Sequence, residues 1–180
     1  MAVKHVALLR GINVGKAKRV AMADLRAPVE GLGYTGVRTL LNSGNVVFTA
    51  PKADANAAAR IEAALAKETG VSARVTVLTA RELAEVVAEN TLAEVATDPT
   101  RLFATVLMDK SDRAKLEPLE KEHWAPEMLT IGTHAVYQWC PDGLLAGRLP
   151  EAVGKVLGDA ATTRNWSTIT KLHAIACDGS

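Results

Sequence analysis

The order of strand and helix patterns in the first 80 residues limits the fold more than any other feature of this sequence. A mostly apolar run over residues 3–9 predicts a buried strand, and apolar residues at helical spacing predict a helix that stops at Gly33. Two further strand-like runs, 37–41 and 46–48, flank the polar tetrapeptide 42–45, which has the composition of a hairpin turn. An alanine-rich helix over 53–69, with Asp54 as its N-cap, and a strand over 71–78 follow. This β-α-β-β-α-β order is the split βαβ pattern of a ferredoxin-like α+β unit.

The second half of the chain has a related element order but no obvious sequence repeat. Residues 79–82, Thr-Ala-Arg-Glu, form a capping box and predict a helix start. A loop over 90–100 then precedes a strand (102–108), a helix (about 112–122), two strands (128–131 and 135–140) and a helix (150–157). Residues 162–166 are expected to lead into a last helix. We therefore predict subdomains over 1–80 and 101–180, joined by a helix and connecting segment over 81–100.

Composition is that of an ordinary globular protein, with 48% hydrophobic and 23% charged residues among 180. No apolar run approaches the ~20 residues that cross a bilayer, and the first ten residues resemble a strand rather than a signal peptide. The two cysteines, Cys140 and Cys177, lack C-x-x-C spacing and fit a reducing compartment. The expected location is therefore the cytoplasm, without a membrane partner.

Basic residues gather at the beginning of the chain although the net charge is only +1. Five of them precede the first acid, Asp24: Lys4, Arg10, Lys16, Lys18 and Arg19. The loop Gly11-x-x-x-Gly15-Lys16-Ala17 follows the first strand, as a Walker A loop would. Its glycines are one residue too close for that motif, and Ala17 has no hydroxyl for magnesium. A glycine-rich turn can still present amides to an anion. The alternative is a solvated basic surface with a tight turn that needs glycine.

Two other polar segments could contribute to such a site. Asn42-Ser43-Gly44-Asn45 has the residues that a hairpin turn requires, so a purely structural role is the simpler explanation. In the segment 162–171, Thr163 or Asn165 could cap the last helix, whose free amides and Arg164 would attract an anion. A plain cap, with Trp166 packing the helix onto the sheet, explains this segment equally well.

Other chemistries lack their usual signatures. The four histidines are scattered, so neither a metal nor another cofactor is predicted. Cys140 and His134 could form a nucleophile and base, but two buried core residues explain them better. Aromatic residues make up 4% of the chain, and no strand resembles a base-stacking RNA motif. Sequence-specific nucleic-acid binding is therefore disfavoured, whereas contact with a phosphate backbone remains open.

Three motifs together resemble a widespread bacterial family, the domain of unknown function 1697. They are LLRGINVG at 8–15, NSGNVVF at 42–48 and TTRNW at 162–166. The resemblance covers the full chain and implies an α+β fold of two ferredoxin-like subdomains in tandem, the second with an extra C-terminal helix. It implies no activity, because none is established for the family. This sequence departs from the usual pattern at Lys16, Ala21 and Ser167, where glycine, proline and asparagine are common.

The leading hypothesis is a protein that binds an anionic, phosphate-bearing ligand at a polar site built from these three segments. One alternative is an enzyme acting on a phosphorylated small molecule or nucleotide. Another is a non-catalytic assembly protein whose motifs form a structural interface, within one chain or in a homodimer. The candidate ligand-binding residues are Arg10, Gly11, Asn13, Gly15, Lys18, Asn42, Ser43, Gly44, Asn45, Thr163, Arg164, Asn165 and Lys171.

Overall fold

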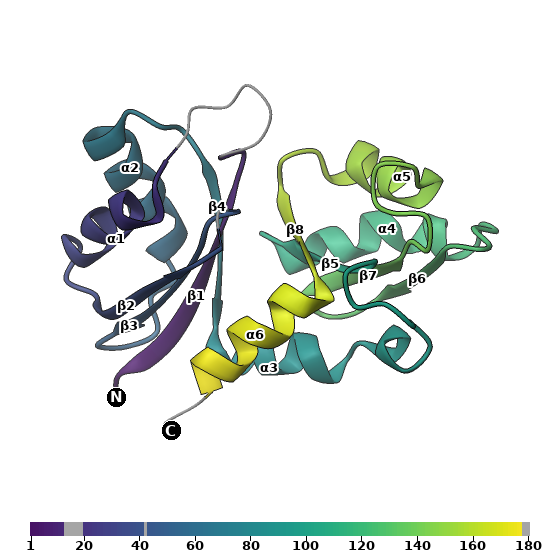
Figure 1. Cartoon of the computed structure of the whole chain (residues 1–180), viewed down its shortest axis with the longest axis horizontal. Helices are drawn as coiled ribbons and strands as arrows, with labels where there is room; N and C mark the ends of the chain where they lie inside the picture. Colours follow the sequence, from purple (N-terminus) through teal and green to yellow (C-terminus); the bar gives the residue numbers. More distant parts are fainter. Residues whose placement is uncertain (13–19, 42, 178–180) are drawn as a thin grey trace. The chain divides into compact units, whose positions relative to one another are not determined.

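A computed structural model describes residues 1–12, 20–41 and 43–177 of the chain (Figure 1). The chain divides into two compact units. Unit 1 contains Met1–Leu83 together with the end of the chain from Ile175, and unit 2 contains Ala84–Ala174. Each unit has a four-stranded antiparallel sheet, so the predicted α+β class and tandem arrangement are confirmed.

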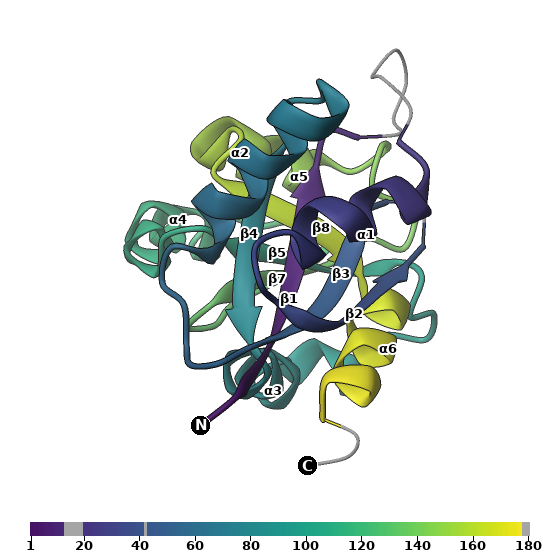
Figure 2. The ribbon, with the colours of Figure 1, turned by 90° about the vertical axis from the view of Figure 1, so that its left-hand side faces the viewer.

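Unit 1 has the element order that the sequence predicts. Its elements are β1 (Val3–Arg10), α1 (Met22–Glu30), β2 (Thr35–Leu40), β3 (Asn45–Ala50), α2 (Ala57–Thr69) and β4 (Arg74–Thr79). The strand order β2-β3-β1-β4 places β1 and β3 in the centre of the sheet. Figure 2 shows α1 and α2 on the same face of this sheet.

The core of unit 1 lies between that face and the two helices. Ala7 and Leu9 of β1 and Phe48 of β3 pack there with Ile61 and Leu65 of α2, and all five are fully buried. Because successive side chains of a strand alternate between faces, Arg10 of β1 extends from the opposite face of the sheet. Alternation along β1 therefore places the core residues Ala7 and Leu9 on one face and the candidate site residue Arg10 on the other.

Helix boundaries in unit 1 differ in two places from the expected ones. α1 includes Pro28 and ends at Glu30, before the expected stop at Gly33. Asp54 was expected to cap α2, but the helix begins at Ala57 and the carboxylate of Asp54 instead accepts a hydrogen bond from the Asn56 amide (2.9 Å). Asp54 thus belongs to the turn before the helix.

Unit 2 contains the remaining elements. These elements are α3 (Ala80–Ala88), η1 (Thr91–Glu94), β5 (Leu102–Leu107), η2 (Lys110–Asp112), α4 (Arg113–Glu120), β6 (Met128–Ile131), β7 (Ala135–Trp139), α5 (Arg148–Leu157), β8 (Ala161–Asn165) and α6 (Trp166–Cys177). The division between the units falls within α3 and again within α6. The strand order is β6-β7-β5-β8, and α4 and α5 pack over one face.

The capping box predicted at the start of α3 is present. The amide of Thr79 donates to the Glu82 carboxylate (2.9 Å), and the amide of Glu82 donates to the Thr79 hydroxyl (3.1 Å). Both partners of the box thus satisfy amides that the first helical turn leaves free. Among the described residues, no helix is both long and apolar enough to cross a membrane.

One strand was missed. Residues 162–166 were expected to lead into the last helix, but Ala161–Asn165 form β8, which pairs with β5 along its whole length. The segment is mostly polar and so lacks the apolar run that marks the other strands. Its consecutive threonines nevertheless suit an extended backbone. With β8 included, unit 2 is a second β-α-β-β-α-β unit, and α6 is the extra C-terminal helix.

Gly44 tests how tightly the turn before β3 packs against the end of β1. Its φ is +89°, and a Cβ there would lie 2.6 Å from Ile12 Cδ1 and 3.0 Å from Leu9 Cβ. We expect Gly44→Ala to lower the free energy of unfolding by about 2–4 kcal/mol, through backbone strain and overpacking. Denaturant unfolding would measure the change.

Gly11→Ala is the matched control. Gly11 has φ +83°, but no atom lies within 4 Å of a Cβ there. Only backbone strain applies, so we expect a loss of about 1 kcal/mol. Equal effects of the two substitutions would contradict the close packing of Gly44.

Candidate functional site

The first two motifs meet at one end of the unit 1 sheet. The amide of Leu9 donates to the carbonyl oxygen of Gly44 (2.9 Å), and Leu8 pairs with Asn45 in the β1–β3 ladder. The turn before β3 is therefore attached directly to the end of β1. The sequence alone does not decide this adjacency, because it depends on the β1–β3 register.

Within the second motif, Asn45 holds the turn rather than facing solvent. Its side chain is fully buried, and Nδ2 donates to the carbonyl oxygen of Leu40 (2.8 Å) and to Ser43 Oγ (3.0 Å). Gly44 is buried and has a left-handed backbone that favours glycine. The hairpin turn predicted at 42–45 is confirmed in its described residues, of which Ser43 alone is exposed.

The end of β1 brings two arginines together. Arg10 pairs with Arg74 of β4 in the antiparallel ladder, so their side chains leave the same face of the sheet. Directly opposite residues have Cβ atoms about 4.5–5.5 Å apart, and like charges at that position destabilise a sheet. Both residues are exposed.

Arg74 was not among the predicted site residues. It lies 64 positions after Arg10, and only the register of β1 against β4 brings the two together. The sequence signal was the predicted strand over 71–78, which contains the arginine but does not reveal its cross-strand neighbour. Gly11, by contrast, was predicted, and it follows Arg10 as an exposed residue with φ +83°. Asn13, Gly15, Lys18 and Asn42 lie outside the described residues.

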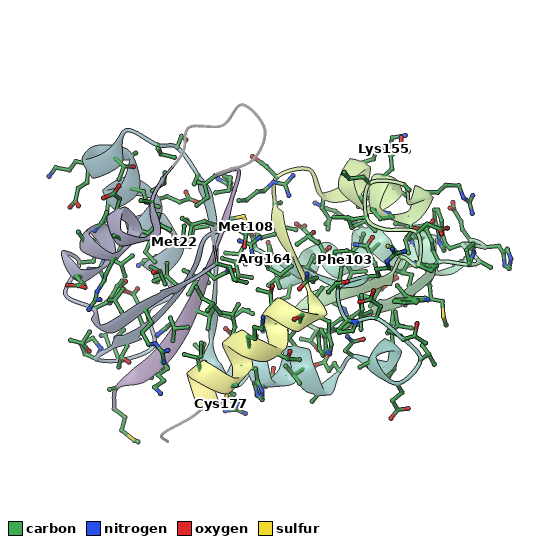
Figure 3. The ribbon with its side chains drawn as sticks, in the orientation of Figure 1. Met22, Phe103, Met108, Lys155, Arg164 and Cys177 are labelled. Carbon is green, nitrogen blue, oxygen red and sulfur yellow. The ribbon has the colours of Figure 1, made fainter. Side chains whose placement is uncertain are left out.

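The third motif is divided between the two faces of the unit 2 sheet. Thr163 pairs with Thr105 and Asn165 with Phe103, whereas Arg164, between them, pairs with Ala104. Thr163 and Asn165 therefore lie on one face and Arg164 on the other. Figure 3 labels Arg164 and Phe103, which belong to the neighbouring strands β8 and β5. The three residues do not line one surface, as a loop would have allowed.

Thr163 and Asn165 have structural partners. The hydroxyls of Thr163 and Thr105 are 2.8 Å apart, and Gln138 Nε2 donates to Thr105 (2.9 Å). Asn165 Oδ1 accepts from the Thr168 amide (2.9 Å), so the cap predicted for the last helix is confirmed. Lys171 is exposed on the same helix.

Arg164 is buried, with 9% of its surface exposed. One guanidinium nitrogen donates to the carbonyl oxygen of Thr163 (2.9 Å). Burial lowers the pKa of Arg164 to about 10, because removing the charge from water disfavours the protonated form. The side chain nevertheless carries its positive charge at neutral pH.

The residues considered as a nucleophile and base are separated. Cys140 follows the last residue of β7 and His134 precedes the first, so the two lie at opposite ends of that strand. Burial, together with the nearby Glu127 carboxylate, raises the pKa of the Cys140 thiol to about 12. His134 instead contacts Glu85 (Nε2 to Oε2, 2.6 Å). Among the described residues, no three metal-binding side chains cluster together.

A second polar cluster, missed by sequence reasoning, lies at the other end of the unit 1 sheet beside a hollow of about 800 Å³. Asp54 Oδ2 accepts from the Tyr34 hydroxyl (2.7 Å) and from Arg60 (2.6 Å), and Arg60 also donates to the carbonyl oxygen of Leu32 (3.1 Å). These bonds fasten the segment after α1 to the segment before α2. The cluster is satisfied within itself, which indicates a structural role.

The hydrogen bonds of this cluster favour the ionised form of Asp54. The hydrogen bond from Tyr34 holds the pKa of Asp54 below its ordinary value of 3.8, with further contributions from the Asn56 amide and Arg60. Burial, with Asp54 beside it, raises the pKa of Tyr34 to about 12. Ionised Asp54 therefore stabilises the fold above pH 3.8, and this contribution disappears as the pH falls through the lowered pKa.

We expect Asp54→Asn to destabilise unit 1 by about 1–2 kcal/mol at neutral pH, because hydrogen bonds to a charged acceptor are replaced by weaker ones. The difference from wild type should shrink as the pH falls below 3.8. Urea unfolding followed as a function of pH would measure it. Asp142→Asn, at an exposed position, is the control, and a pH-independent difference for Asp54→Asn would contradict this account.

The geometry defines an α+β protein of two split βαβ units, with a paired-arginine end on the first sheet. The chain belongs to the family described as protein of unknown function, DUF1697, whose family model matches residues 2–137. The matched segment includes the first two motifs and ends before the third. A comparison with curated proteins gave no match.

One solved structure supports the fold. The conserved bacterial protein SP0830 from Streptococcus pneumoniae is 23% identical, with a TM-score of 0.73 over 98% of this chain and 99% of that chain. A structure described as "Putative Chlorite dismutase TA0507" is 12% identical, with a TM-score of 0.25 over 95% of this chain and 98% of that chain. The second similarity carries no argument. That the three motifs act as one ligand site stays a prediction.

Proposed function

We propose that this protein binds an anionic, phosphate-bearing ligand at the end of the unit 1 sheet. The observation that carries this proposal is the direct cross-strand pairing of Arg10 and Arg74. The exposed residues Gly11 and Ser43 lie in the two turns that adjoin this end. We call Arg10, Arg74, Gly11 and Ser43 the arginine-pair site.

Two guanidinium groups on neighbouring strands suit phosphate for geometric reasons. Each presents a planar fork of N–H donors that bonds two oxygens at once, and charged hydrogen bonds of this kind are among the strongest in proteins. The β1–β4 ladder fixes the two Cα atoms, so only the arginine side chains need ordering when the ligand binds. The net charge of +1 gives no general attraction for anions, which makes the local pair the relevant feature.

A dianionic phosphate monoester matches the charge of two arginines. The turn at Gly11, next to Arg10, has open space on its Cβ side. The alternative of an enzyme requires a general base or a metal at the same place. Two guanidinium groups supply positive charge and hydrogen-bond donors but neither a base nor a metal, so we infer binding rather than catalysis at this pair.

We expect Arg10→Ala and Arg74→Ala each to weaken binding of a phosphate ligand by roughly tenfold or more, since a hydrogen bond to a charged group contributes about 1.5–3 kcal/mol. Pyrophosphate, a sugar phosphate and a nucleoside monophosphate are suitable probes, with titration calorimetry as the measurement. The double variant should lose less than the sum of the two single losses, because both arginines contact one group.

Arg113→Ala is the matched control, because Arg113 is an exposed arginine on α4. It should leave the affinity unchanged. Binding should also weaken with salt, because the ligand replaces counterions around the arginines. Wild-type protein that binds none of the three probes, or that loses equal affinity in all three single variants, would refute the arginine-pair site.

A further inference from the structure

The four edge strands of the two sheets are not equally protected against pairing with another chain. Edge strands commonly carry charges, prolines or bulges that prevent such pairing. Three of these edges carry an arginine: Arg38 in β2, Arg74 in β4 and Arg164 in β8. The β2 ladder also shifts register between Thr35 and Arg38.

The fourth edge, β6, has none of these features. Its sequence is Met-Leu-Thr-Ile, without charge or proline, and it pairs with β7 in an unbroken register. It lies at the outer side of the unit 2 sheet, next to β7 (Figure 1). Shortness, at four residues, is its one protective feature.

The backbone of β6 offers unused hydrogen-bonding groups at this edge. The Gly132 amide donates to the carbonyl oxygen of Ala135 (2.8 Å), which closes the two-residue turn between β6 and β7. Counting back from that pair, Thr130 bonds toward β7, whereas Leu129 and Ile131 direct their N–H and C=O groups away from it. The described residues supply no partner for these four groups.

The side chains at the same edge are incompletely buried. Leu129 and Ile131 pack against the core of unit 2 but remain half-buried, and Met128 is 43% exposed. An added strand would cover the exposed parts of Leu129 and Ile131. Exposed apolar side chains and unpaired backbone groups therefore occur together at the β6 edge.

We propose that β6 pairs antiparallel with β6 of a second copy of this chain, about a two-fold axis through Thr130. In this register Leu129 lies opposite Ile131 of the second copy, and Ile131 opposite Leu129. All the outward groups are then used, because each of these two pairs exchanges both of its backbone hydrogen bonds. The Leu–Ile pairs lie on the helix-covered face, and the two Thr130 side chains meet on the other.

The self-complementary register favours a second copy over an unrelated peptide. A two-fold axis perpendicular to the sheet keeps each face continuous, so residues that meet must share a face. Centring the pair on Thr130 meets this condition and matches apolar side chains with apolar ones. The interface is small, so we expect a weak dimer whose population depends on concentration.

The test is sedimentation velocity on the full chain from micromolar to near-millimolar concentration. Wild type should shift from monomer toward dimer. Thr130→Lys places two like charges across the axis and should raise the dissociation constant by roughly tenfold. Thr130→Glu should do the same, and an equimolar mixture of the two variants should restore dimers.

Thr35→Lys on β2 is the control, because Thr35 is an exposed residue on another edge strand and should leave dimerisation unchanged. Circular dichroism of each variant checks that the chain is folded. Wild type that stays monomeric throughout, a dimer that Thr130→Lys leaves intact, or a mixture that fails to restore dimers would each overturn the proposal. The last result would show that Thr130 acts only within its own chain.

Discussion

The close packing of the turn before β3 against the end of β1 is the tightest backbone contact described in unit 1. Gly44 packs against Leu9 and Ile12 at a distance that leaves no room for a side chain, and its carbonyl oxygen accepts the Leu9 amide. This contact fixes the register at the end of β1. Strand alternation then places Arg10 on the face opposite the helices, and the β1–β4 register places it beside Arg74. The proposed arginine-pair site therefore adjoins a turn in which only glycine fits.

Local patterns predicted much of the fold. The element order of unit 1, the Thr79–Glu82 capping box, the turn at 42–45 and the cap formed by Asn165 are all properties of short segments. Each depends on residues at most a few positions apart, which is the range over which turn and capping chemistry act. This explains why the class and the tandem order could be derived without coordinates.

Features that depend on pairing between distant segments could not be predicted in the same way. The Arg10–Arg74 pair follows from strand register, and the contacts among Tyr34, Asp54 and Arg60 follow from two loops meeting beside the sheet. The strand β8 was missed because its threonines and Arg164 give no apolar run. Its partner β5 supplies the missing hydrogen bonds, which is a tertiary effect that outweighs the local pattern.

The alternation of β8 also separates residues that sequence proximity had grouped together. Thr163 shares a hydroxyl contact with Thr105, which in turn accepts from Gln138, while Arg164 belongs to the other side of the strand. Thr163 and Arg164 should therefore be substituted independently of each other among related sequences. Thr163 would be expected to covary with Thr105 and Gln138, three side chains drawn from three strands, and to vary independently of the arginine next to it in the chain.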